Sequence, residues 1–177
     1  MSTERMRVAY ADPPYIGLAR YYRDHPDYGG EVDHAALIER LLAEFADGWV
    51  LHCHSNALRT LLPLCPEQVR VLAWLKPFCS WKPDSNPVYT WEPVLLVGGR
   101  ARSYHRGGTS VRDHLSESMS IRRGLVGAKP EAVCFWLFEA LGLTADDELV
   151  DLYPGTGGVT RAWERWRTGM FSRRVRG

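Results

Sequence analysis

The sequence contains little cysteine. Its four cysteines lie far apart, and none has the C-x-x-C spacing of zinc sites and redox motifs: Cys53, Cys65, Cys79 and Cys134. We therefore expect reduced thiols, with neither a disulfide framework nor a zinc site. His52 and His54 would share one face of a strand, but no third ligand is signalled beside them, so no metal site is expected.

Long apolar runs are also absent. No segment approaches the ~20 consecutive apolar residues of a membrane helix, and the first five residues are not followed by the apolar run of a signal peptide. These absences predict a soluble, cytoplasmic protein with no membrane partner. With 177 residues and 45% hydrophobic content, the chain suits a single domain over residues 1–177.

The chain as a whole lacks an excess of charge of one sign. Its net charge is +1, which alone gives no reason to expect a polyanionic partner. The distribution is uneven, however: residues 99–125 carry six basic against two acidic side chains, and residues 161–177 carry six against one. Such a pattern is expected of a local phosphate-binding face, and solvated loops would produce it equally well.

A short motif of an acid, two prolines and an aromatic ends the first apolar run. The residues from Arg7 to Ala11 are typical of a buried strand, and Asp12-Pro13-Pro14-Tyr15 follows at its carboxyl end, where α/β sheets place their chemistry. Asp12 and the carbonyl of Pro13 could each accept one N–H of an exocyclic amine, and Tyr15 could stack on a base. A plain strand-to-loop exit with proline punctuation is the alternative.

A second strand end lies near the other end of the chain. Residues 149–152 predict a short strand, which is followed by a glycine-rich turn and then by a helix through about Trp166. Glycines at such a turn let the backbone approach a cofactor closely, and the helix N-terminus then faces an anionic group. The residues of interest here are Asp151, Tyr153, Gly155, Thr156, Gly157 and Gly158.

Together these strand ends resemble the amino-directed S-adenosylmethionine-dependent methyltransferases of nucleic acids. Asp12 to Tyr15 matches the target-amine motif of that family, in which an Asp, Asn or Ser precedes Pro-Pro and an aromatic residue. Asp151 to Gly157 is similar to its cofactor motif D-x-F-x-G-x-G, and Lys129-Pro130 matches the element that holds the methionine end of the cofactor. The target motif precedes the cofactor motif, which resembles the circularly permuted β class, and aspartate at the first position is similar to the adenine-N6 members.

The resemblance implies a fold, a cofactor and a reaction. The fold would be a Rossmann-like α/β methyltransferase sheet of class I, circularly permuted and trimmed, with helices on both faces and with residues 7–11 and 149–152 as adjacent parallel strands. S-adenosylmethionine would be held by Lys129, Pro130 and the turn from Asp151 to Gly158. The methyl group would pass to the exocyclic amine of a base, adenine N6 in DNA rather than RNA, with a homodimer or a partner subunit possible.

Two features of that family are missing. The interval that houses its target-recognition domain is only about 27 residues long here, residues 99–125, and has no hydrophobic periodicity. We expect a basic loop in its place, whose arginines bind phosphates rather than read bases: Arg100, Arg102, Arg106, Arg112, Arg122 and Arg123. Beyond Arg167 no further strand ends in an acid that could hold the cofactor ribose.

Two other functions stay open on the sequence alone. A non-catalytic nucleic-acid-binding subunit that keeps the fold would explain the missing ribose acid, but it would have no reason to retain Asp12 at a strand end. An enzyme that methylates an amine of RNA or of a free nucleoside is the other alternative, although a free nucleoside leaves the arginine clusters unexplained.

The remaining elements follow from local patterns. Asp33 is expected to cap an amphipathic helix, and an apolar core helix should follow Pro130 and run to Leu141. Strands are expected over residues 49–53, 69–75 and 94–97, with Pro93 restricting the last of these to an edge or terminal position. Residues 16–32, directly after the predicted catalytic strand, are a candidate lid.

Overall fold

The centre of the molecule is a six-stranded sheet in the computed structural model, which describes residues 4–23, 29–78, 85–101, 110–119 and 129–169. The strands lie in the order β5-β3-β4-β2-β1-β6, and β4 alone is antiparallel to its neighbours. Their bounds are β1 Arg7–Ala11, β2 Gly48–His52, β3 Arg70–Leu75, β4 Trp91–Gly98, β5 His114–Ser116 and β6 Glu148–Asp151.

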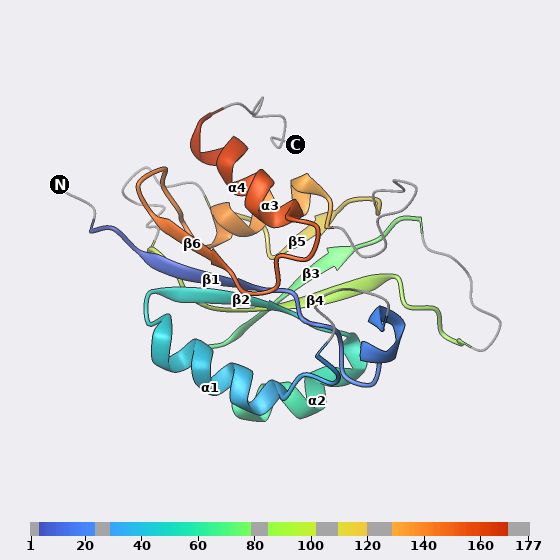
Figure 1. Cartoon of the computed structure of the whole chain (residues 1–177). Coiled ribbons are helices and arrows are strands. Elements are labelled where there is room, and N and C mark those ends of the chain that lie inside the picture. The colour runs from blue at the N-terminus through green and yellow to red at the C-terminus, as the bar shows by residue number, and fades with distance from the viewer. Residues whose placement is uncertain (1–3, 24–28, 79–84, 102–109, 120–128, 170–177) are drawn as a thin grey trace.

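Helices cover both faces of this sheet (Figure 1). Helices α1 (His34–Glu44) and α2 (Leu58–Leu61) lie on one face, and α3 (Glu131–Ala140) and α4 (Gly158–Arg167) lie on the other. Short 3₁₀ turns complete the order: η1 Ala19–Tyr22, η2 Ser55–Ala57 and η3 Leu62–Leu64. The predicted α/β sheet with helices on both faces is therefore confirmed. In the part of the chain that the structure describes, no helix has both the length and the apolar character needed to cross a membrane.

The sheet separates two hydrophobic cores, and strand β1 contributes side chains to both. Successive side chains of a strand point to opposite faces, so Val8 and Tyr10 pack into the core beneath α3 and α4, while Ala9 and Ala11 pack into the core against α1. All four side chains have no exposed surface. Because β1 is buried on both faces, the position of its carboxyl end is fixed by packing from above and below.

The two longest predicted helices form for the expected reasons. The Asp33 carboxylate accepts hydrogen bonds from the amides of Ala35 and Ala36 at the start of α1, each at 3.0 Å. Helix α3 is apolar nearly all round and contributes five buried side chains to the core: Val133, Cys134, Trp136, Leu137 and Phe138. Both assignments are confirmed.

The expectation that Pro93 marks an edge or terminal strand is wrong. Pro93 is the third residue of β4, which lies between β3 and β2 in the sheet. Its carbonyl accepts a hydrogen bond from the Cys53 amide at 3.2 Å, so its nitrogen faces the β2 side as well. Because β2 ends at His52, the missing N–H lies beyond the last residue of β2 and removes no ladder bond.

The interval 99–125 is not a loop throughout, which corrects a second expectation. It contributes β5, which pairs in parallel with β3. Two indole groups bind the backbone on either side of β5. Trp136 donates to the carbonyl of Arg112 at 2.9 Å, and Trp74 donates to the carbonyl of Glu117 at 2.8 Å. A three-residue strand is too short to show a periodic pattern in the sequence, and the tryptophans that hold it are distant in the chain.

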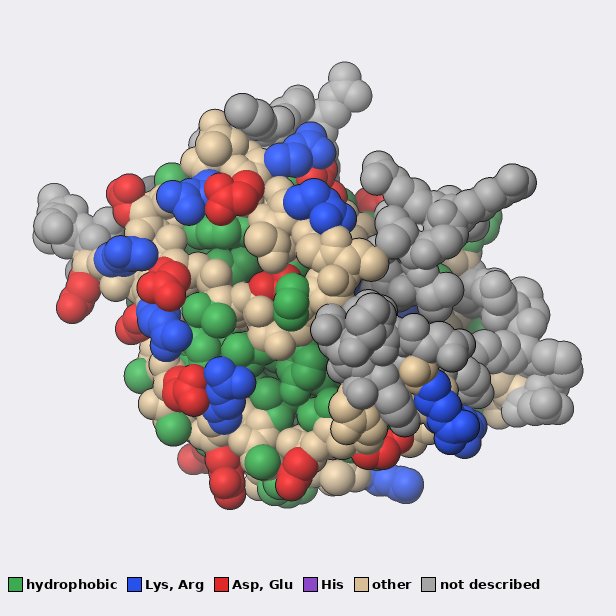
Figure 2. All heavy atoms as spheres, viewed as in Figure 1, with side chains coloured by type: hydrophobic (Ala, Val, Ile, Leu, Met, Phe, Trp, Pro, Cys, Tyr) green, Lys and Arg blue, Asp and Glu red, His purple; other side chains and the backbone are tan. Residues whose placement is uncertain are grey.

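The described surface carries charges of both signs. Figure 2 shows hydrophobic side chains gathered in the middle of one face, with Lys, Arg, Asp and Glu side chains interspersed around them. Several of these charges form exposed ion pairs, such as Arg40 with Glu44 at 3.1 Å. Exposed pairs of this kind add little to stability, so the folded body depends mainly on its two cores.

The described cysteines are free thiols, as expected. Cys53 and Cys134 are buried and Cys65 is partly buried, whereas Cys79 lies outside the described residues. Burial raises the pKa of both the Cys53 and the Cys134 thiol to about 12. Both thiols are therefore protonated at neutral pH and are poor nucleophiles.

Candidate active site

The two predicted motifs meet at one edge of the sheet. Strands β1 and β6 are adjacent and parallel, with Tyr10 beside Asp151, and the Leu152 amide donates to the carbonyl of Tyr10 at 3.0 Å. Asp12 and the glycine turn therefore leave neighbouring strands at their common carboxyl edge. The sequence prediction that these strands are adjacent and parallel is confirmed.

Asp12 is bound to a largely buried lysine. Its Oδ1 lies 2.9 Å from Nζ of Lys129, whose side chain is only 8% exposed. The same ammonium lies 3.2 Å from Oε1 of Glu92 and donates to the hydroxyl of Tyr15 at 3.1 Å. Three acceptors thus match the three N–H donors of the ammonium, and they fix the positions of Asp12 and Tyr15 relative to each other.

Glu92 is the buried anion of this group. Its Oε2 accepts from Lys76 at 2.7 Å, and its Oε1 accepts from Nδ1 of His52 at 2.8 Å. Burial alone would raise the pKa of Glu92, but Lys129, His52 and Lys76 together hold it well below its usual value. Burial would likewise lower the pKa of Lys129, but Asp12 and Glu92 raise it above its usual value. Both groups are therefore charged at neutral pH.

His52 links Glu92 to the buried side chain of Tyr10 in β1. Since its Nδ1 faces a carboxylate, that nitrogen carries the proton, and Nε2 accepts from the hydroxyl of Tyr10 at 2.7 Å. Burial raises the pKa of Tyr10 well above its usual value, so its hydroxyl remains a donor. The sequence predicted no role for Glu92 in this site. A polar residue inside an otherwise apolar strand, such as His52 in β2 or Glu92 in β4, is the signal that could have revealed it.

The same residues include a possible set of metal ligands. Asp12, His52 and Glu92 each place one ligand atom within 4.8 Å of the others. However, the Lys129 ammonium contacts Asp12 and Glu92, and both ring nitrogens of His52 are hydrogen-bonded. A cation here would have to displace Lys129, so we describe the group as an ion-pair network.

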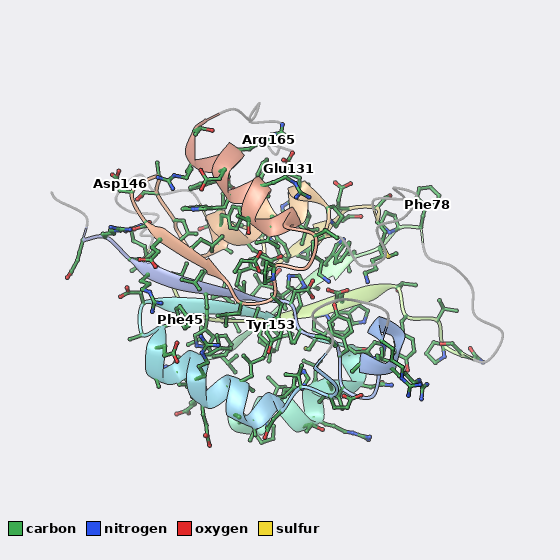
Figure 3. All side chains as sticks on the ribbon, in the orientation of Figure 1. Phe45, Phe78, Glu131, Asp146, Tyr153 and Arg165 are labelled. Atoms are coloured by element: carbon green, nitrogen blue, oxygen red, sulfur yellow. The ribbon has the colours of Figure 1, made fainter. Side chains whose placement is uncertain are left out.

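The turn after β6 is braced by Asp151. One carboxylate oxygen accepts from the Tyr153 amide at 3.3 Å, and the other accepts from the hydroxyl of Thr160 in α4 at 3.1 Å. Gly155 and Gly157 have φ values of +47° and +74°, which favour glycine over any residue with a side chain. Figure 3 labels Tyr153, which follows β6 and packs against the core on the α1 side.

Lys129 and Pro130 precede α3, on the same face of the sheet as α4. Pro130 is buried at the N-cap of α3. Contact of Lys129 with the methionine end of a cofactor stays a prediction, and it would require one of the three bonds of the ammonium to be given up. What the structure shows is a direct link from Lys129 to Asp12.

Arg100 needs a correction, because its guanidinium is used within the fold. Its two terminal nitrogens bind the Asp147 carboxylate at 2.8 and 2.9 Å and also donate to the carbonyls of Gly142 and Glu4. Burial would raise the pKa of Asp147, but the bonds from Arg100 and from backbone amides hold it well below its usual value. Arg100 therefore joins Glu4 to the segment from Gly142 to Asp147, and its terminal nitrogens serve the fold rather than a phosphate.

Of the five remaining predicted arginines, the structure describes one. Arg112 is exposed just before β5. Four of them lie outside the described residues: Arg102, Arg106, Arg122 and Arg123. The candidate lid over residues 16–32 includes η1, whereas its residues 24–28 are also outside the described part. Phosphate binding by the interval 99–125 stays a prediction.

The fold is similar to that of two solved structures. The chain is similar to the crystal structure of M1.HpyAVI in complex with S-adenosylmethionine, with a TM-score of 0.55 and 13% identity, over 91% of this chain and 78% of that one. The crystal structure of M1.HpyAVI gives a TM-score of 0.56 at 14% identity, over 92% and 78% of the two chains. At this identity the likeness concerns the fold alone.

Sequence comparison is less informative. No family model matches the chain. A UPF0260 protein of Rhodopseudomonas palustris (strain HaA2) is 36% identical over 73 residues, which are 37% of this chain and 42% of that protein. A UPF0260 protein of Allorhizobium ampelinum is 33% identical over 90 residues, 47% and 53% of the two chains. The chain thus spans about half, or less, of the length of these relatives, and their name assigns no activity.

Proposed function

We propose that this protein is an S-adenosylmethionine-dependent methyltransferase that acts on the exocyclic amine of a nucleic-acid base, namely adenine N6 in DNA. One observation carries the proposal: Asp12-Pro13-Pro14-Tyr15 leaves β1 directly beside the glycine turn that leaves β6. The likeness of the fold to the M1.HpyAVI complex with S-adenosylmethionine supports it. Direct methyl transfer between two bound molecules requires the amine site and the cofactor site to be adjacent. Neighbouring strand ends provide that arrangement.

The turn after β6 fits a cofactor. Its left-handed residues at positions 155 and 157 are glycines, and a Cβ added at Gly158 would meet nothing within 4 Å. The space at Gly158 is therefore open, whereas a Cβ at Gly157 would meet the Arg161 guanidinium at 3.0 Å, which donates to the carbonyl of Thr156. The turn leads into α4, whose first amides can face an anionic group. Bound here, S-adenosylmethionine would supply an electrophilic methyl group with a neutral leaving group, and the turn from Asp151 to Gly158 would hold it.

The chain's own residues would orient the amine. Lys129 holds Oδ1 of Asp12, which leaves Oδ2 and the carbonyl of Pro13 as acceptors for the two N–H groups of an exocyclic amine. Two such bonds direct the nitrogen lone pair toward the methyl group. Tyr15, with its hydroxyl bonded to Lys129, would present its ring to the base. Positioning of this kind supplies most of the acceleration, so no nucleophilic side chain is needed.

The decisive experiment is nucleoside analysis by mass spectrometry. The protein is incubated with DNA or RNA and S-adenosylmethionine carrying a deuterated methyl group, and the digested nucleosides are analysed. We expect labelled N6-methyldeoxyadenosine. Asp12→Ala should remove the label while calorimetry shows unchanged cofactor binding, and Asp12→Asn should leave some activity because an amide oxygen still accepts one N–H.

The other outcomes separate the alternatives. If the label appears in RNA or in added free nucleosides but not in DNA, the substrate is RNA or a free nucleoside instead of DNA. Cofactor binding without label in any substrate would favour a non-catalytic subunit that keeps the fold. Absence of cofactor binding would overturn the proposal, as would full activity in Asp12→Ala.

A further inference from the structure

A row of rings continues along the sheet edge beyond Tyr15. The ring of His54, just after β2, lies 6.5 Å from that of Tyr15, and the ring of Tyr89, just before β4, lies 4.3 Å from that of His54. The hydroxyl of Tyr89 accepts a hydrogen bond from the Asn56 side chain at 2.7 Å. Tyr89 is thus held by a ring contact with His54 and by its hydroxyl, yet 43% of the residue remains exposed.

A hollow in the surface adjoins this row and is lined by Ser55, Asn56, Leu58 and Arg59. Three of these side chains offer hydrogen-bond donors, and no acidic residue is among the four. Arg59 is exposed in α2. A hydroxyl, an amide and a guanidinium around one hollow are donors suited to phosphate oxygens.

Exposed apolar side chains also occur along this edge of the sheet. Among the described residues, eight large hydrophobic side chains are exposed, and five of them adjoin this edge: Ile16, Leu75, Phe78, Tyr89 and Met119. Figure 3 shows Phe78 where the chain leaves β3, and it is 80% exposed. Of these five, Tyr89 belongs to the row of rings.

We infer that Tyr89 and the hollow at Arg59 bind an unpaired nucleotide next to the target base. The base of this neighbour stacks on the exposed part of the Tyr89 ring, and its phosphate lies in the hollow against Arg59, Ser55 and Asn56. Within a duplex the faces of a base are covered by its neighbours, so only a single-stranded or opened segment can use this platform. The inference rests on the proposed function and narrows its substrate to unpaired strands.

Binding measured without cofactor tests this inference. Fluorescence anisotropy would compare a single-stranded oligonucleotide with a duplex of the same sequence. Tyr89→Ala should weaken single-strand binding about 5- to 150-fold, the range for loss of one stacked base, while duplex binding changes less than twofold. Tyr89→Phe should retain most of the binding that Tyr89→Ala loses, because the ring is retained and only the hydrogen bond from Asn56 is removed.

Arg59→Ala should weaken single-strand binding and lower the salt slope by about 0.7, the value for one phosphate contact on a single strand. Arg70→Ala is the matched control, because Arg70 is exposed at the amino end of β3, on the opposite edge of the sheet, and it should change neither quantity. Unchanged single-strand binding in Tyr89→Ala would overturn the inference. Equal losses for single strand and duplex, or no nucleic-acid binding by the unchanged protein, would do so too.

Failure of the proposed function looks different. If the unchanged protein transfers no methyl group and binds no S-adenosylmethionine, but still binds single strands in a manner that needs Tyr89, the nucleotide site stands and the enzymatic assignment falls. If methyl transfer occurs on duplex DNA with no dependence on Tyr89, the assignment stands and the nucleotide site falls.

Discussion

Lys129 lies between two carboxylates, so replacing it with methionine should leave two buried charges without their shared partner. The side chains of Lys129, Asp12 and Glu92 are 8%, 18% and 5% exposed. Removing one partner of such a buried group costs about 3–5 kcal/mol. For a chain of this size that corresponds to a fall in Tm of roughly 6–20 °C.

The assay is urea unfolding at pH 7.5, followed by tryptophan fluorescence. Arg40→Met is the matched control, because its pair with Glu44 is exposed and should contribute no more than about 0.5 kcal/mol. Glu92→Gln introduced into Lys129→Met should recover part of the loss, since it removes one of the unpaired charges. Measured as a double-mutant cycle, the coupling should exceed about 1 kcal/mol.

The pH dependence gives an independent check. The folded pKa of Glu92 is depressed, so its contribution to the free energy of unfolding is complete above its usual value of 4.5 and is lost as the pH falls below that value. The difference between the unchanged protein and Lys129→Met should therefore shrink as the pH is lowered from 5 toward 3. A loss below about 1 kcal/mol, or one equal to that of Arg40→Met, would refute the network as described.

Three further predictions follow from single positions. Gly157→Ala should cost about 1–2 kcal/mol because its φ of +74° is left-handed, while Gly158→Ala, with open space around it, should be neutral, as chemical unfolding would show. Arg100→Ala should cost about 3 kcal/mol in the same measurement by leaving the buried Asp147 carboxylate without its ion-pair partner, and it should not change the salt slope of nucleic-acid binding. The Cys53 thiol should resist labelling at pH 8 until the protein unfolds, which mass spectrometry of its peptide would detect; fast labelling of the native protein would contradict its burial.

Local patterns were enough to predict the elements that carry the site. The apolar run that ends at Ala11, the double proline after Asp12 and the cap at Asp33 each act within a few residues, so the strand, its end and helix α1 could be predicted directly. The glycine turn after β6 was predictable for the same reason, because the left-handed backbone at Gly155 and Gly157 excludes most other residues.

Contacts between distant segments were decided by the tertiary structure. Glu92 and Lys129 come from different elements, and only the order of strands and the position of α3 bring their charges within 3.2 Å of each other. In the same way, Arg100 meets Asp147 across the domain, although its place in a basic interval predicted a phosphate ligand. The residues next to a charged side chain in the sequence do not determine its ion-pair partner. Burial and strand order determine which opposite charge lies near it, and they bring Asp12, Lys129 and Glu92 into one network.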